Sequence, residues 1–151
     1  MTNWPLDAVE LAQALIRCES VTPVEGGALS ALEGWLAPLG FACERMPFTD
    51  DGTPDVDNLF ARAGSPNAGP HICFAGHTDV VPIGDRADWK HGPFDAEIAD
   101  GILYGRGTVD MKGAIAAFVA ASAAYVTETG DDLPGAISFL ITGDEEGPSV
   151  N

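Results

Sequence analysis

The feature that most constrains the fold is a short apolar run, residues 72–75 (Ile-Cys-Phe-Ala), which leads directly into Gly76-His77-Thr78-Asp79. A continuously apolar run of this length, placed soon after Pro70, is typical of a strand buried on both faces of a parallel sheet. Open α/β sheets bind ligands in the crevice beyond the carboxyl ends of such strands. His77 and Asp79 are therefore predicted to enter a crevice. They should point to the same side, because residues two apart on an extended chain do so.

Two further segments bring acidic residues to the ends of predicted elements. The apolar residues 135–142 predict a second buried strand, which leads into Asp144, Glu145 and Glu146. The glycine-rich residues 105–113 contain Asp110 and open an alanine-rich helix predicted over 114–127. In a twisted α/β sheet these ends are expected to converge on one crevice.

The remaining patterns predict two helices, two weaker strands and a hairpin. They cover residues 6–18 and 29–39 for the helices, 41–46 and 58–63 for the strands, and a tight turn at Asp100-Gly101 for the hairpin. The order of the elements predicts an α/β fold for residues 1–151. We expect a mixed, mostly parallel sheet with helices on both faces.

Composition and charge argue against several classes of function. The chain has 151 residues, 46% of them hydrophobic, which suits one domain with a core. Its 23 acidic and 7 basic residues give a net charge of −16, which argues against a nucleic acid or an anionic membrane surface as partner. No segment approaches the roughly 20 apolar residues that span a bilayer, and we see no secretory signal pattern. Three widely spaced cysteines predict buried free thiols in a reducing compartment, so we expect a cytoplasmic protein.

The candidate functional residues are an imidazole and several carboxylates: His77 with Asp79, then Asp110, then Glu145 with Glu146. This set, without thiolates, suits divalent zinc, cobalt or manganese. Clustered carboxylates repel one another, and cations relieve that repulsion. Two cations roughly 3.5–4 Å apart could share one carboxylate and activate a water between them. One of the adjacent glutamates could face this water while the other binds a cation, because both cannot point the same way from an extended segment.

Each of these residues also has a purely structural interpretation. His77 taken alone could be a hydrogen-bonded core histidine, and Asp110 could cap the helix that follows it. Glu145 and Glu146 could be solvated loop residues. The residues expected to lie outside any site are Asp144, His71 and His91.

Four motifs together resemble those of a known family. They are Gly76-His77-Thr78-Asp79-Val80-Val81-Pro82, residues 89–94, residues 100–113, and Thr142-Gly143-Asp144-Glu145-Glu146-Gly147-Pro148. The motifs are similar to those of the co-catalytic metallopeptidases and amide hydrolases, which include succinyl-diaminopimelate desuccinylases, acetylornithine deacetylases and aminoacylases. The first and last motifs look most like those of the desuccinylases. The resemblance implies a zinc-peptidase-like catalytic domain that binds two divalent metal ions, with zinc first and cobalt as the alternative.

The resemblance also implies a role for each residue. His77 would bind one zinc, Asp79 would orient the His77 ring, and Asp110 would bridge both zincs, with a cis peptide bond after it. Glu145 would take a proton from the attacking water and return it to the leaving amine, and Glu146 would bind the second zinc. The implied reaction is hydrolysis of N-succinyl-L,L-2,6-diaminopimelate to succinate and L,L-diaminopimelate, in lysine biosynthesis.

Members of this family are much longer than 151 residues. They have a further glutamate ligand, a final histidine ligand and an inserted dimerisation domain, so the resemblance implies that residues 1–151 are the N-terminal part of the catalytic domain of a homodimer. We expect this part alone to be inactive and to hold zinc poorly. The expected partner is a small N-acylated amino acid. Two alternatives stay open: the activity of an acetylornithine deacetylase or aminoacylase, and a metal-binding module without catalysis.

Overall fold

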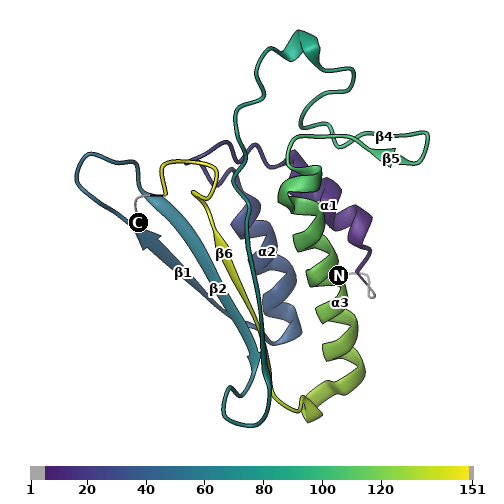
Figure 1. Ribbon diagram of the computed structural model, residues 1–151. Helices are drawn as coiled ribbons and strands as arrows, with labels where there is room; N and C mark the ends of the chain where they lie inside the picture. Colours follow the sequence, from purple (N-terminus) through teal and green to yellow (C-terminus); the bar gives the residue numbers. More distant parts are fainter. Residues whose placement is uncertain (1–5, 150–151) are drawn as a thin grey trace.

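The computed structural model describes residues 6–149, which form an α/β fold with a four-stranded sheet, three helices and a small hairpin (Figure 1). The helices are α1 (Ala8–Arg17), α2 (Ala28–Leu36) and α3 (Gly113–Thr129). The strands of the sheet are β1 (Ala42–Phe48), β2 (Val56–Gly64), β3 (His71–His77) and β6 (Ala136–Thr142). The hairpin pairs β4 (Ile98–Ala99) with β5 (Ile102–Leu103), as Asp100-Gly101 predicts.

Local sequence explains where the helices begin and end. Helix α1 begins after Asp7, whose carboxylate accepts hydrogen bonds from the backbone N–H groups of Val9 and Glu10 and so caps the first turn. The chain leaves α2 through a short turn that ends at Gly40, with a φ of 85°. Glycine adopts this left-handed conformation at little cost, so Gly40 ends the helical segment as predicted.

The sheet has the strand order β1-β2-β6-β3. Strand β2 pairs antiparallel with β1 and with β6, whereas β3 and β6 are parallel. The predicted α/β class and mixed sheet are confirmed. The expectation of a mostly parallel sheet is wrong for the described residues, because the two weaker strand candidates form the antiparallel half. The parallel pair places His77 opposite Thr142, so the carboxyl ends of both strands lie side by side.

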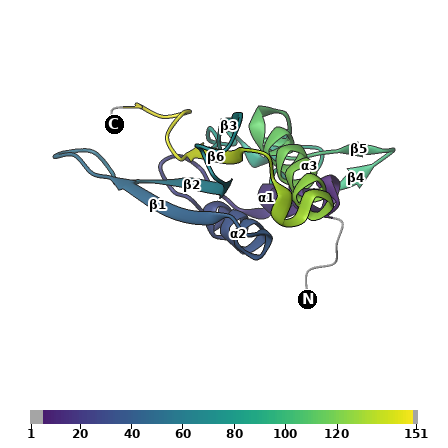
Figure 2. The ribbon, with the colours of Figure 1, turned by 90° about the horizontal axis from the view of Figure 1, so that it is seen from below.

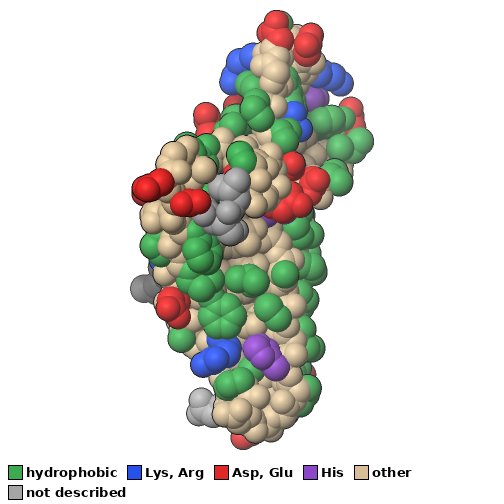
Figure 3. Space-filling view, turned by 60° about the vertical axis from the view of Figure 1, so that its left-hand side comes forward, with side chains coloured by type: hydrophobic (Ala, Val, Ile, Leu, Met, Phe, Trp, Pro, Cys, Tyr) green, Lys and Arg blue, Asp and Glu red, His purple; other side chains and the backbone are tan. Residues whose placement is uncertain are grey.

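The three helices lie on one face of the sheet (Figure 2), and the prediction of helices on both faces is therefore wrong for residues 6–149. Their apolar side chains pack against residues that alternate along β2 and β6, such as Leu59, Phe139 and Ile141. The surface in Figure 3 includes many hydrophobic side chains. On the face of the sheet away from the helices, Leu140 of β6 lies opposite Phe60 of β2 and Ala75 of β3. Leu140 is 37% exposed, so apolar groups of this face meet solvent.

Strand β3 is less buried than its apolar sequence predicts. It lies at the edge of the sheet, where Ile72 is 57% exposed and Cys73 is also exposed. The cysteines are free thiols, as predicted, but the prediction that they are buried is wrong: Cys18 and Cys43 are partly exposed and Cys73 is exposed. An apolar run specifies that a strand needs cover, and it cannot specify which neighbour supplies it.

Helix α3 and the turn before it, Thr108–Thr129, form a 22-residue stretch that is long and apolar enough to cross a membrane by length and composition alone. This finding corrects the expectation that no segment reaches that limit, because the many alanines of α3 count as apolar. In the fold, Ile115, Ala116 and Val119 are fully buried in the core that α3 forms with the sheet.

Candidate metal centre

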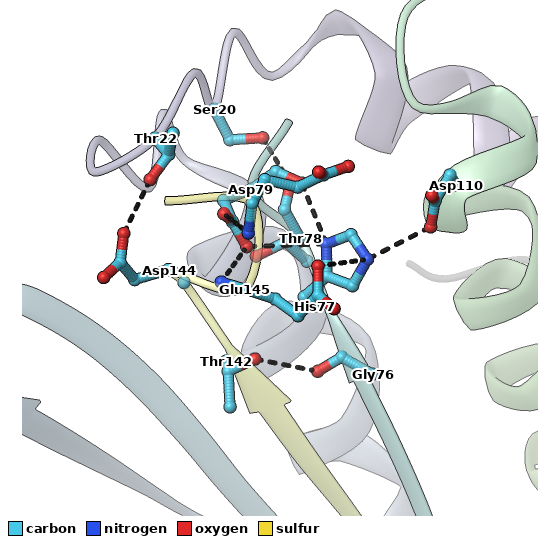
Figure 4. Close-up of polar contacts among 12 residues, drawn as sticks. Ser20, Thr22, Gly76, His77, Thr78, Asp79, Asp110, Thr142, Asp144 and Glu145 are labelled. Atoms are coloured by element: carbon cyan, nitrogen blue, oxygen red, sulfur yellow. Dashed lines mark hydrogen bonds and ion pairs between the residues drawn. The ribbon is translucent and has the colours of Figure 1, made fainter. Parts of the chain in front are cut away.

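Three distant segments of the chain meet at the carboxyl ends of β3 and β6. His77 is the last residue of β3, and β6, its parallel neighbour, leads into the turn that holds Asp144, Glu145 and Glu146. Asp110 comes from the Thr108–Lys112 turn that opens α3, and it faces His77 across the site (Figure 4). The structure thus brings together residues that lie up to 69 positions apart, His77 to Glu146.

The His77 ring has a defined orientation. It is 4% exposed, and its Nδ1 lies 3.0 Å from the backbone carbonyl oxygen of Asp79. A carbonyl only accepts, so Nδ1 carries the hydrogen and donates it. In the neutral ring Nε2 then has a lone pair, which faces Asp110 Oδ1 at 3.2 Å and Glu145 Oε2 at 3.7 Å. Three acceptors that face one another need a cation between them, either a proton or a metal ion.

Asp79 organises the turn that follows β6. Its side chain is 1% exposed, and its two carboxylate oxygens accept hydrogen bonds from the backbone N–H groups of Glu145 (3.2 Å) and Glu146 (2.9 Å). Oδ1 also lies 3.4 Å from His77 Nδ1, farther than the Asp79 carbonyl. The carboxylate therefore fixes the two glutamates relative to the histidine, while the carbonyl of the same residue fixes the ring.

Asp110 is held outside regular helix geometry. Its φ of −124° and ψ of 98° are extended, and the Asp110–Met111 peptide bond is cis, as the resemblance predicts. Gly107, with a φ of 81°, lets the chain turn closely past Val80, since a Cβ there would lie 2.6 Å from Val80 Cγ1. The Asp110 side chain is 74% exposed, so it faces open space as well as His77.

The donor set fits a divalent cation. His77, Glu145 and Glu146 each offer a ligand atom within 4.8 Å of the others, and Asp110 Oδ1 adds a further oxygen beside His77. Nitrogen and carboxylate oxygen donors suit zinc, cobalt and manganese. Burial lowers the pKa of His77, but the hydrogen bond to the Asp79 carbonyl and the nearby carboxylates outweigh burial and raise the pKa above its ordinary value. The site therefore favours a positive charge at His77 Nε2, where a metal ion would bind.

Sequence reasoning missed the groups that support this centre. Lys112 is fully buried, and its Nζ donates a hydrogen bond to the Cys18 carbonyl (2.8 Å). The Ser20 hydroxyl donates to the Thr78 carbonyl (2.6 Å), next to His77. These contacts join the segment after α1 to the site. The sequence signal for this support was a lysine two residues after Asp110. Because lysines are usually exposed, that signal does not predict a buried residue.

The residues expected to lie outside the site do so. Asp144 has a structural role, because its carboxylate accepts from the Thr22 hydroxyl (2.8 Å) and from the Ser149 N–H (2.9 Å). His71 Nε2 lies 2.8 Å from the Ser138 hydroxyl at the far end of β3. His91 pairs with Glu97 at 2.9 Å in the loop region.

Residues 73–151 match the family model described as Peptidase family M20/M25/M40. The chain is 63% identical over 147 residues to a succinyl-diaminopimelate desuccinylase from Parvibaculum lavamentivorans, a match that covers 97% of this chain and 36% of the relative. The chain therefore spans about a third of that curated relative's length.

Two solved structures share the fold. Human carnosine dipeptidase 1 is 30% identical with a TM-score of 0.81, over 95% of this chain and 33% of that one. An M20 family metallo-carboxypeptidase from Sulfolobus solfataricus is 21% identical with a TM-score of 0.72, over 93% of this chain and 31% of that one. The mixed sheet and its helices are thus the arrangement found in peptidases of this kind.

Proposed function

The chain belongs to peptidase family M20/M25/M40, and from that premise we propose that it is the N-terminal, metal-binding part of a longer amide hydrolase. The observation that carries the proposal is the orientation of His77 Nε2 toward Asp110 and Glu145, with Glu146 close by. About two thirds of the desuccinylase from Parvibaculum lavamentivorans lies outside the match. The corresponding part of the longer protein would supply the remaining ligands and substrate contacts.

In this proposal His77, Asp110 and Glu146 hold two divalent metal ions, with zinc preferred and cobalt as an alternative. Asp110 is suited to bridging, because its exposed carboxylate borders both His77 and the cavity that Glu146 lines. When bound, the ions would supply Lewis acidity toward the amide carbonyl and make hydroxide available near neutral pH. Asp79 acts as a positioning residue through its bonds to the glutamate N–H groups.

Glu145 is proposed to move the proton. Its carboxylate is 61% exposed and lies beside His77, so it can reach a water that attacks the amide carbon. Glu145 takes one proton from that water as the carbon–oxygen bond forms. It returns the proton to the amide nitrogen as the carbon–nitrogen bond breaks, so the amine leaves neutral. The second proton of the water stays on the new carboxylic acid, which then ionises to the carboxylate by releasing that proton to solvent.

The substrate is proposed to be N-succinyl-L,L-2,6-diaminopimelate, by analogy with the desuccinylase that is 63% identical to this chain. The products are succinate and L,L-diaminopimelate. We further propose that the full-length protein is a cytoplasmic homodimer. The net charge of −16 fits a small-molecule substrate rather than a nucleic acid or an anionic membrane.

The test replaces Glu145 with Ala in the full-length protein. We expect turnover of N-succinyl-L,L-diaminopimelate to fall about 10²–10⁴-fold, as loss of a general acid–base group does, while bound metal per chain stays unchanged. Loss of metal instead would make Glu145 a ligand, which its place beside His77 and Glu146 also allows. Unchanged turnover and unchanged metal content would refute the assigned role.

Three further measurements complete the experiment. Glu44→Ala removes an exposed carboxylate from β1, away from the site, and should leave both readouts unchanged. N-acetylornithine as substrate separates the rival activity, since a faster rate on it would identify a deacetylase. The 151-residue chain assayed alone with added zinc should be inactive, because ligands supplied by later residues are missing.

A further inference from the structure

Lys112 is fully buried, and the proposed reaction gives it no role. A fully buried lysine is uncommon, because its ammonium group loses the hydration that it has in water. Its Nζ donates a hydrogen bond to the Cys18 carbonyl at 2.8 Å, and within residues 6–149 no ion pair joins it to a carboxylate. The hydrogen bond connects the turn that carries Asp110 to the residue that follows α1. A contact made in spite of this cost indicates that the position of the turn matters.

The segment 18–22 is also bonded to the loop that follows His77. The Ser20 hydroxyl donates a hydrogen bond to the Thr78 carbonyl at 2.6 Å. In the opposite direction, the Val80 N–H donates to the Ser20 carbonyl at 2.9 Å. One segment of backbone therefore contacts both sides of the metal centre: it contacts this loop directly, and it contacts the turn before α3 through the buried lysine.

Two glycines let the turn before α3 approach these partners closely. A Cβ on Gly105 would lie 2.5 Å from Ile16 Cγ2 of α1. A Cβ on Gly107 would lie 2.6 Å from Val80 Cγ1 and 3.2 Å from Lys112 Cδ. The turn is thus packed tightly against α1, the loop after β3 and the stem of the lysine. In packing this close, a shift of the lysine moves the turn with it.

The Asp110 carboxylate has little else to hold it in place. Its side chain is 74% exposed, and the one hydrogen bond that it makes among the described residues joins Oδ1 to His77 Nε2, 3.2 Å away. A metal ion bound to both residues would replace that contact. The place of the carboxylate must therefore come from the backbone around it. Lys112 closes this stretch of backbone, because its own N–H donates to the Gly107 carbonyl at 2.9 Å.

We infer that Lys112 is a positioning residue for Asp110. Its hydrogen bond to the Cys18 carbonyl holds the turn so that the Asp110 carboxylate faces His77. The inference rests on the proposed function and deepens it, because it names a group outside the metal centre that sets the geometry of that centre. A protonated lysine has no lone pair to offer a metal ion, so Lys112 acts through Asp110. Its effect on metal binding should vanish when the Asp110 carboxylate is absent.

The test is a double-mutant cycle on the zinc affinity of the full-length protein, measured by competition with a chromophoric chelator. Lys112→Met keeps a long, unbranched side chain and removes the donor. It should weaken zinc binding about tenfold, as loss of a group that orients a metal ligand does. In an Asp110→Ala background, where His77 and the two glutamates remain as ligands, the same change should alter the affinity less than about twofold.

Two further variants separate positioning from general stability. Lys90→Met removes the same charge from an exposed position and should leave the zinc affinity unchanged in both backgrounds. Lys112→Arg keeps a donor for the Cys18 carbonyl and should bind zinc more tightly than Lys112→Met. If Lys112→Met does not fold, Lys112→Gln takes its place in the same cycle.

The outcomes of the cycle are distinct. An equal loss of affinity in both backgrounds would mean that Lys112 only stabilises the fold. No loss in either background would mean that the turn keeps its place without the lysine. Each of these results overturns the inference and leaves the proposed function standing. A wild-type protein that binds no zinc would refute the proposed function and the inference together.

Discussion

Replacing Asp79 with Asn changes one buried oxygen to an NH2 group at the point where the turn after β6 is attached to β3. The carboxylate accepts from the N–H groups of Glu145 and Glu146, and an amide has one oxygen to offer them. One hydrogen bond to a charged acceptor, about 1.5–3 kcal/mol, is lost, and a buried N–H is left facing another donor. We expect unfolding free energy to fall by about 3 kcal/mol. Zinc affinity should fall about 10–100-fold, as it does when a group that orients a metal ligand is removed.

The assay is a zinc titration of the full-length protein in competition with a chromophoric chelator, with urea unfolding of the same samples. Asp144→Asn is the matched control, because Asp144 lies in the same turn but bonds Thr22 and Ser149 instead of the glutamates beside His77. It should reduce stability without changing zinc affinity. If Asp79→Asn binds zinc within twofold of wild type, the carboxylate does not organise the centre and our account of the turn is wrong.

Two further predictions concern charges at the site. Burial lowers the pKa of Lys112 from 10.5 to about 8, and it outweighs the charges of Cys18 and Asp79, which raise the pKa. In the unfolded chain Lys112 therefore stays protonated to a higher pH than in the folded chain. The free energy of unfolding should rise between pH 8 and 10.5 by up to about 3 kcal/mol. Lys112→Met should abolish this part of the rise, as urea unfolding of the metal-free protein at both pH values would show. The pKa of His77 is raised above its ordinary value of 6.5. In the metal-free protein the protonated ring therefore adds to the free energy of unfolding below pH 6.5, and this contribution is lost as the pH rises through the pKa of the folded protein. Zinc must displace that proton, and its affinity, measured by chelator competition, should fall about tenfold per pH unit below the folded pKa; a flat profile would show that His77 is not a ligand.

The sequence predicted the elements whose patterns are local. Helix α1, the hairpin at Asp100-Gly101 and strand β6 lie where periodicity and turn residues placed them. The direction of strand pairing was predicted less well, because residues 41–46 and 58–63 have no feature that distinguishes antiparallel from parallel partners. The edge position of β3 was missed for the same reason: an apolar sequence reports a need for burial and leaves the partner unspecified.

The site shows a similar division. His77, Asp110 and Glu145 were recognisable because all three follow apolar strands or precede a helix, at ends that an α/β sheet brings to one crevice. Lys112 was not recognisable, because a basic residue in a turn is normally solvated. The burial of Lys112 is a property of the folded chain, and it became evident when the turn was seen packed against Cys18, whose carbonyl accepts a hydrogen bond from the lysine.

The one parallel strand pair accounts for the convergence of the whole centre. In an antiparallel pair, the residues that follow two neighbouring strands leave at opposite edges of the sheet. Because β3 and β6 are parallel and His77 is opposite Thr142, the histidine and the acidic turn lie at the same end of the strands. A parallel pair needs a crossover, and here the crossover contains α3, whose first turn supplies Asp110. The two antiparallel pairings could change without separating these groups, whereas loss of the β3–β6 register would separate all of them.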